Sequence, residues 1–141
     1  MRHILAAAAV AVTVMMTAPA QAAVVEARID LSDQSMRVYQ NGFLRYTWKV
    51  STARRGYVTP TGTYGPTRMH KMWYSRKYHM SPMPHSIFFR GGYAIHGTNE
   101  LKRLGSPASH GCVRLHPDNA RVLFGLVKSV GSNNTKITIT R

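Results

Sequence analysis

The sequence has little cysteine and little negative charge. A single cysteine in 141 residues cannot form an intramolecular disulfide. Only five side chains are Asp or Glu, against 19 Lys and Arg, which gives a formal net charge of +14. Carboxylates are scarce and no His-x-x-x-His or His-x-x-Glu pair falls on a predicted helix, which argues against a zinc hydrolase. The sequence also lacks internal repeats, linkers and any appended binding module.

Only one long apolar run occurs, and it lies at the N-terminus. A basic residue precedes an apolar stretch over residues 4–16, and Pro19 is followed by a small-x-small cleavage pattern. This pattern is typical of a secretory signal peptide, here residues 1–22. The run is shorter than the ~20 residues that span a bilayer. We therefore expect cleavage, a single exported domain over residues 23–141, and no transmembrane segment after cleavage.

The excess of basic residues predicts a surface that attracts polyanions. For an exported protein, the anions at hand are cell-wall carboxylates, lipopolysaccharide and anionic lipid, rather than nucleic acid. The charge also fits a plain role in solubility, and both interpretations stay open. A non-catalytic basic wall-binding protein would use this charge and ignore the cysteine. Its candidate patch consists of Arg54, Arg55, Arg68, Lys71, Arg76 and Lys77.

Alternating apolar residues and turn signals predict a mostly β domain, a small sandwich or barrel with one clear helix near the C-terminus. The expected strands cover residues 24–31, 36–40, 43–51, 63–68, 86–90, 93–96 and 136–140. Asn41-Gly42 is a strong signal for a hairpin turn. Pro117 suits the first turn of a helix, and apolar residues recur at helical spacing through residues 118–128.

Residues 68–85 have no clean period and hold two prolines among aromatic, methionine and basic residues. We expect a long, partly ordered excursion from the sheet, of the kind that often forms a functional lid. Thioether and imidazole groups also suit Cu(I), so an exported copper-binding protein is an alternative. Packing of methionines into irregular gaps is the simpler explanation. The residues concerned are Met69, His70, Met72, His79, Met80, Met83 and His85.

The single cysteine lies in the stretch S-H-G-C-V-R, residues 109–114. A structural cysteine usually lies inside an apolar strand or helix, so this glycine-flanked context favours a reactive thiol. Gly111 removes a side chain just before Cys112, which lets a substrate backbone approach and main-chain N–H groups face an oxyanion. The thiol needs a base. His110, two residues before it, and His96, at the end of a predicted strand, are both candidates.

His96, followed by twelve residues and then by the S-H-G-C-V-R stretch, resembles the signature of the YkuD-type L,D-transpeptidases. The resemblance extends to residues 50–52 (VST) and 59–64 (TPTGTY) and covers nearly all of residues 23–141. It implies a small β-rich sandwich that acts on peptidoglycan stem peptides. The bond attacked would lie between the L-centre of a diamino acid and a terminal D-alanine.

The resemblance implies a role for each residue of the motif. Cys112 would be the nucleophile and His96 the general base, oriented by a backbone carbonyl at residues 97–98. Gly111 and Cys112 would donate backbone N–H groups to the oxyanion, and His110 would brace the turn. The acyl group would pass to an amine of a second stem or of an envelope protein. With water as acceptor the protein would be an L,D-carboxypeptidase, and an amidase on the same scaffold is a further alternative.

Substrate contacts follow from the same resemblance. Arg114 would clasp a carboxylate, and Ser109 and Gly97 would lie beside the substrate. Trp73, Tyr74 and Tyr78, in the lid, would contact glycan or stem peptide. The resemblance implies no metal or other cofactor, and it implies a location in the periplasm or cell wall.

Overall fold

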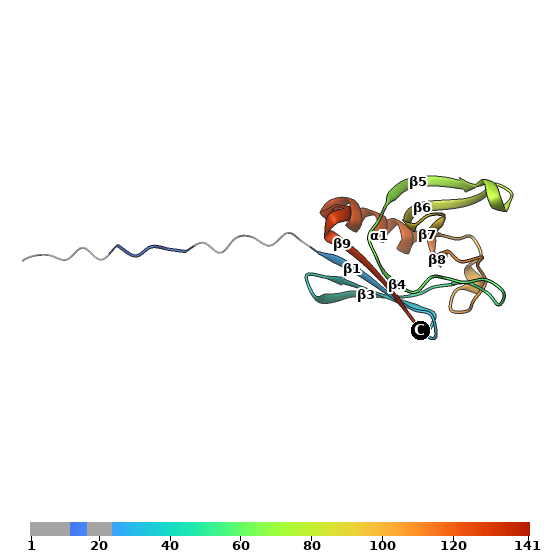
Figure 1. Ribbon diagram of the computed structural model, residues 1–141, viewed down its shortest axis with the longest axis horizontal. Coiled ribbons are helices and arrows are strands. Elements are labelled where there is room, and N and C mark those ends of the chain that lie inside the picture. The colour runs from blue at the N-terminus through green and yellow to red at the C-terminus, as the bar shows by residue number, and fades with distance from the viewer. Residues whose placement is uncertain (1–11, 17–23) are drawn as a thin grey trace, which may run out of the picture.

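Two β sheets and one α helix build the fold of residues 24–141 (Figure 1). The structure is a computed structural model, and it describes residues 12–16 and 24–141. The five-stranded sheet has the strand order β3-β2-β1-β9-β4, and the four-stranded sheet has the order β5-β6-β7-β8. The signal peptide expected at residues 1–22 lies outside the described residues, apart from residues 12–16.

The five-stranded sheet begins with the predicted meander. Its strands are β1 (Val25–Asp30), β2 (Ser35–Gln40), β3 (Phe43–Lys49), β4 (Gly62–Tyr64) and β9 (Thr135–Thr140). β1 pairs antiparallel with β2 and parallel with β9. Asn41 and Gly42 have φ angles of 51° and 81°, as a two-residue hairpin turn requires. The predicted strands and turn over residues 24–51 are confirmed.

The four-stranded sheet carries the residues of the cysteine motif. Its strands are β5 (Arg68–Ser75), β6 (Ser81–Arg90), β7 (Tyr93–Gly97) and β8 (Val113–Leu115). A short 3-10 helix, η1 (Arg76–Tyr78), forms the tip of the β5–β6 hairpin, and η2 (Leu101–Arg103) lies between β7 and β8. β7 and β8 are parallel neighbours. β8 begins directly after the cysteine and was not predicted, because it has only three residues.

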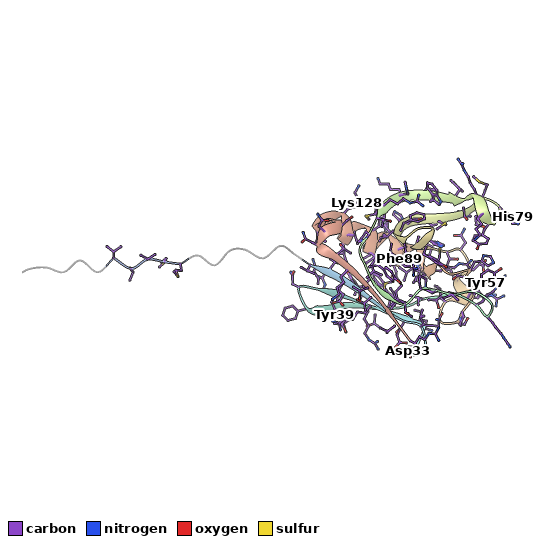
Figure 2. The ribbon with its side chains drawn as sticks, in the orientation of Figure 1. Asp33, Tyr39, Tyr57, His79, Phe89 and Lys128 are labelled. Atoms are coloured by element: carbon purple, nitrogen blue, oxygen red, sulfur yellow. The ribbon has the colours of Figure 1, made fainter. Side chains whose placement is uncertain are left out.

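The main core lies between the two sheets and against α1 (Pro117–Val130). Phe89 of β6 belongs to this core and lies near the centre of the molecule in Figure 2. The helix begins at Pro117, as predicted, and buries Leu123 and Val127. It ends at Val130, and Gly131 follows as the C-cap, before η3 (Ser132–Asn134). No helix within residues 12–16 and 24–141 is long and apolar enough to cross a membrane.

The prediction of a partly ordered excursion over residues 68–85 is wrong. These residues form β5, η1 and the first half of β6, a long regular hairpin (Figure 1). Pro82 and Pro84 argued against a strand, because proline removes a backbone N–H. Both nevertheless pair with β5, whereas β7 pairs with β6 only from Ile87 onward. This end of β6 is therefore open on one side, where a missing N–H costs no ladder hydrogen bond.

The second face of the four-stranded sheet carries a smaller apolar cluster. Met83, Phe88 and Ala94 are buried there, and Trp73 and Cys112 pack against them. Ile87 and Phe89, which flank Phe88, face the main core instead, because side chains alternate along a strand. The single cysteine therefore lies on the face of the sheet that points away from the main core.

Candidate active site

A cavity of about 530 Å³ opens on this second face of the four-stranded sheet. Cys112 and His96 both line it, together with Ser109, His110 and Arg114. With Trp73, which also lines it, the structure thus brings six of the expected site residues into one cavity. Its volume lies in the range of pockets that hold small molecules or short peptide segments.

Cys112 lies directly before β8, beside β7. The parallel register pairs Ile95 with Val113, so that Cys112 lies next to Ala94. Side chains alternate along both strands, and Ile95 and Val113 face the main core. Cys112 and His96 therefore project from neighbouring strands to the same side of the sheet, two residues apart in register.

His96 is nearly fully buried at the end of β7, with 6% of its surface exposed. Its Nδ1 lies 2.7 Å from the carbonyl oxygen of Gly97. A carbonyl oxygen can only accept, so Nδ1 carries the proton and Nε2 keeps a free lone pair. A Cβ on Gly97 would lie 3.0 Å from Pro84 Cγ and 3.2 Å from Pro117 Cα. Close packing therefore fixes the backbone that holds the ring.

Burial shifts the imidazole and the thiol toward their neutral forms. It lowers the pKa of His96 from 6.5 to about 4, and the hydrogen bond to Gly97 offsets this only in part. Burial also raises the pKa of the Cys112 thiol, against the opposing effect of a backbone hydrogen bond with Ala94. At neutral pH the site therefore holds a neutral imidazole and a neutral thiol rather than an ion pair.

The loop before Cys112 is held by side-chain hydrogen bonds. Ser109 Oγ donates to the carbonyl oxygen of Cys112 at 2.6 Å and accepts from the N–H of Gly111 at 3.0 Å. Thr59 Oγ1 donates to the carbonyl oxygen of Gly111 at 2.9 Å. The N–H of Gly111 is thus engaged inside the loop. Among the hydrogen bonds of residues 24–141, none uses the N–H of Cys112.

The same loop requires glycine at position 111. Gly111 has a φ of 135°, and a Cβ there would lie 2.5 Å from Tyr93 Cε1 and 2.9 Å from the carbonyl oxygen of Val58. Residues 51–54 run beside residues 108–114 and exchange backbone hydrogen bonds with them. Backbone pairing and close packing together fix the position of the cysteine.

His110 is held between two tyrosine rings. Its ring stacks on Tyr78 at 4.1 Å with an interplanar angle of 22°, and lies 4.6 Å from the ring of Tyr57. Burial, followed by the charge of Arg54, lowers the pKa of His110. Figure 2 shows Tyr57 and His79, the residue after Tyr78, at the same end of the molecule. The stack connects the tip of the β5–β6 hairpin to the cysteine loop, so the hairpin covers the cavity at this end.

The charged side chains that line the cavity are mainly positive. Arg68, Arg76, Lys77 and Arg114 line it, and Glu100 is its single acidic lining residue. Arg114 Nη1 lies 3.7 Å from Glu100 Oε2, a long contact to an exposed carboxylate. Such a pair contributes little and leaves the guanidinium able to bind another anion. The cavity therefore favours a negatively charged ligand.

The remaining expected substrate contacts divide between the cavity and its surroundings. Trp73 lines the cavity and packs against Met83 and Phe88. Tyr74, the next residue, is 49% exposed and is absent from the lining. Gly97 is also absent from the lining and acts on the site through its carbonyl oxygen.

The methionine side chains of residues 69–85 lie in different surroundings. Met69 packs against the main core and Met83 belongs to the smaller cluster. Met72 and Met80 are about half exposed, at 46% and 56%. Within the described part of the chain, no group of three or more His, Cys, Asp or Glu side chains could hold a metal ion.

Sequence reasoning gave no site role to Thr59, Tyr93 or Arg68. Thr59 lies in a stretch noted only for its resemblance to a family, and it reaches Gly111 across 52 positions. Tyr93 follows a Gly-Gly turn, and its contact with Gly111 depends on tertiary packing. Arg68 was assigned to a surface patch, although it lines the cavity. No local signal in the sequence marks any of these contacts.

Comparisons with known proteins agree on one family. The model of the YkuD family, described as an L,D-transpeptidase catalytic domain, matches residues 25–139. A Bacillus licheniformis protein whose name carries both YkuD and L,D-transpeptidase is 24% identical over 122 residues, which cover 79% of this chain and 63% of that protein.

Solved structures share the fold. An L,D-transpeptidase from Mycobacterium smegmatis superposes with a TM-score of 0.76 at 20% identity, over 84% of this chain and 59% of that one. An L,D-transpeptidase in complex with imipenem superposes with a TM-score of 0.74 at 19% identity, over 84% of this chain and 59% of the other. The chain thus spans less than two thirds of the length of these relatives.

Proposed function

The chain belongs to the YkuD family of L,D-transpeptidase catalytic domains, and on this premise we propose that Cys112 takes an acyl group from a peptidoglycan stem peptide and passes it to an amine. The donor is a stem tetrapeptide, cleaved between the L-centre of a diamino acid and the terminal D-alanine. The acceptor is an amine of a second stem or of an envelope protein. One observation carries the proposal: the only thiol shares a cavity with a buried imidazole whose Nδ1 is bound to a carbonyl oxygen.

Acylation begins with proton transfer from Cys112 to His96. The thiol, which contacts the carbonyl oxygen of Gly92 at 3.8 Å, turns toward Nε2 of His96 when a donor enters. Nε2 accepts the proton as the sulfur attacks the donor carbonyl carbon, so the thiolate exists only as the C–S bond forms. The C–N bond then breaks, and the imidazolium returns its proton to the amine of the leaving D-alanine. A thioester at Cys112 remains.

Negative charge on the donor carbonyl oxygen needs a hydrogen-bond donor as the sulfur attacks. The N–H of Cys112 is the first donor in this proposal. The N–H of Gly111 is the second, and it must turn from Ser109 Oγ, which it contacts at 3.0 Å. Arg114, with its long contact to Glu100, is suited to hold a carboxylate of the donor.

Transfer to the acceptor repeats the proton movements in reverse. The acceptor amine attacks the thioester carbon and gives a proton to Nε2 of His96. The C–S bond then breaks, and the imidazolium returns a proton to the Cys112 thiolate. The stack of Tyr78 on His110 covers one end of the cavity, which limits the entry of water and favours the amine. Water in the same position would give an L,D-carboxypeptidase.

The products distinguish these outcomes. The protein is incubated with disaccharide tetrapeptides, and the products are separated and weighed. Cross-linked dimers are expected from transpeptidation, and they differ in mass from the trimmed tripeptides that hydrolysis gives. Exchanged termini, formed when a free D-amino acid is the acceptor, have a third mass. Tripeptides as the sole product would replace the transpeptidase with a carboxypeptidase.

The nucleophile is tested separately by intact-mass measurement. Incubation with a donor tetrapeptide, or with imipenem as a reactive acyl donor, should add one acyl group to the protein. Cys112→Ala should abolish this mass shift, because the chain has no second thiol. A Cys112→Ala protein acylated at the original rate would overturn the proposal.

A further inference from the structure

We infer that Arg68 forms a second anion subsite in the cavity, about 10 Å from the Cys112 backbone, which binds a free carboxylate of the donor peptide. This inference rests on the proposed function, because it concerns the donor that occupies the same cavity. Arg114 lies two residues from the nucleophile, whereas Arg68 comes from the far edge of the sheet. The two guanidinium groups would therefore bind two different groups of one donor peptide.

Arg68 and Cys112 lie on one row that crosses the sheet. Arg68 pairs with Phe88, Phe88 pairs with Ala94, and Ala94 lies beside Cys112, as the pairing of the next residues shows. Neighbouring strands are about 4.8 Å apart, so the row spans about 14 Å between its first and last Cα atoms. The Arg68 guanidinium carbon lies 3.7 Å from the centre of the Phe88 ring. The charge thus lies above the second strand, about 10 Å from the Cys112 backbone.

Two aromatic rings hold the Arg68 guanidinium in place. It lies over Phe88 and 4.7 Å from the centre of the Trp73 ring. The ring of Trp73 packs edge-on to Phe88, with the centroids 5.7 Å apart, so both aromatic contacts are parts of one cluster. The N–H groups of a guanidinium point outward in its own plane. A guanidinium that lies over an aromatic ring therefore keeps them available to an oxygen ligand. Its order before binding reduces the entropy lost when a carboxylate binds.

The surroundings of Arg68 offer no competing carboxylate. None of the ion pairs in residues 24–141 involves it. The sequence contains no Asp or Glu between Asp33 and Glu100, which includes the whole of β5, β6 and β7. Arg76 and Lys77, beyond the other end of β5, line the same cavity. A ligand carboxylate bound at Arg68 would therefore meet no competing carboxylate from β5, β6 or β7.

The distance limits which carboxylate can bind. An extended peptide advances about 3.3–3.6 Å per residue, so about 10 Å corresponds to up to three residues. Two sources on a stem tetrapeptide lie within this reach. One is a side-chain carboxylate of the diamino acid, in a stem whose diamino acid carries one, and the other is a carboxylate of the residue before it. Both offer the same chemistry to a guanidinium, and experiment must separate them.

Binding to the Cys112→Ala protein tests the inference without any acyl transfer. Calorimetry would compare three donor tetrapeptides: one with both carboxylates free, and two in which one or the other is converted to an amide. We expect one of the two amides to raise the Kd about tenfold or more, since hydrogen bonds between charged groups are the strong ones. The amide that weakens binding identifies the source of the carboxylate.

A second variant assigns the effect to Arg68. Arg68→Gln in the Cys112→Ala protein should abolish the difference between acid and amide, and Arg68→Lys should restore it only in part, because lysine lacks the planar fork. Lys71→Gln is the matched control, because it removes one charge from β5 outside the cavity lining. It should keep the full difference.

The outcomes separate this inference from the proposed function. Equal Kd values for all three peptides would overturn the subsite, and this result needs no Arg68 variant. An acid-to-amide difference that survives in Arg68→Gln would overturn it as well. If the Cys112→Ala protein binds the acid peptide selectively, but the protein with Cys112 intact never acquires an acyl group, the subsite is supported and the transpeptidase is refuted.

Discussion

The hydroxyl of Ser109 donates a hydrogen bond of 2.6 Å to the carbonyl oxygen of Cys112. Ser109 Oγ also accepts a hydrogen bond from the N–H of Gly111 at 3.0 Å, so one side chain holds both residues that follow His110. Ser109 is 1% exposed, and both contacts are therefore shielded from water. The serine of the motif therefore positions Cys112, the proposed nucleophile, in addition to lining the cavity.

Ser109→Ala should loosen the cysteine loop. Loss of a buried hydroxyl leaves two backbone groups without partners and should cost about 1–3 kcal/mol of unfolding free energy. Denaturant unfolding measures this loss, and intact-mass kinetics with imipenem should show slower acylation. Ser106→Ala is the control, since its exposed hydroxyl contacts the carbonyl oxygen of Arg103. Equal stability of the two variants would show that the hydrogen bonds of Ser109 do not stabilise the fold.

The two histidines of the site should respond differently to alanine. His96→Ala removes the base and should slow acylation about 100-fold to 10,000-fold. His110→Ala removes a ring from the stack with Tyr78 and Tyr57, and should change the rate far less. Thermal unfolding of both variants checks the fold. If His110→Ala alone abolished acylation in a folded protein, the assignment of the base would be wrong.

The acylation rate should show little dependence on pH near neutrality. The active form of His96 is neutral, and burial lowers its pKa to about 4. The rate should therefore stay level from about pH 7 to about pH 5 and decrease only as the pH approaches about 4. Rapid-mixing measurements with imipenem test this profile. A rate that halves near about pH 6.5, the usual value for histidine, would contradict the buried-base assignment.

Stability must be followed in the same pH series. Because the pKa of His96 is lower in the folded state than its usual value, its contribution is complete above about pH 6.5 and is lost as the pH falls toward about 4. Circular dichroism at each pH separates acid unfolding from protonation of the base. His96→Gln should make unfolding less sensitive to acid, since it removes the group that titrates.

Hydrophobic alternation and turn residues correctly predicted the first strands and the hairpin turn between them. The alternation in residues 24–40 and the Asn-Gly turn gave the first strands, because one buried face imposes a period of two. The resemblance to the YkuD signature, rather than any local pattern, predicted that His96 and Cys112 share a site, and both line one cavity. Short-range periodicity could not predict β8, which consists of three residues held by β7 on one side and by Ser51 on the other.

The features that the sequence did not predict depend on contacts between residues far apart in the chain. Pro82 and Pro84 argued against a strand, yet β7 does not reach that end of β6. The contact of Tyr78 with His110 joins residues 32 positions apart, and it exists only because the hairpin extends over the cysteine loop. Tyr74 was expected at the site with Trp73, but adjacent residues of a strand face opposite sides.

Gly111→Ala should be the most damaging of the single-methyl changes. The residue has a φ of 135°, and the new Cβ would lie 2.5 Å from Tyr93 Cε1 and 2.9 Å from a backbone oxygen. A backbone oxygen cannot turn aside as a flexible side chain can, so the cysteine loop itself must move. The expected loss is about 3 kcal/mol or more of unfolding free energy, from strain combined with overpacking, together with loss of acylation.

Gly125→Ala is the matched control for this substitution. It lies on the exposed side of α1, where a Cβ would meet nothing within 4 Å. Alanine there should raise the unfolding free energy by up to about 1 kcal/mol, because glycine is the poorer helix former, and acylation should be unchanged. The two variants add the same methyl group. A decrease in unfolding free energy for Gly111→Ala and an increase for Gly125→Ala, both measured in urea, would show that the effect comes from the geometry of the cysteine loop. A Gly111→Ala protein as stable and as reactive as Gly125→Ala would show that the loop adapts to a side chain.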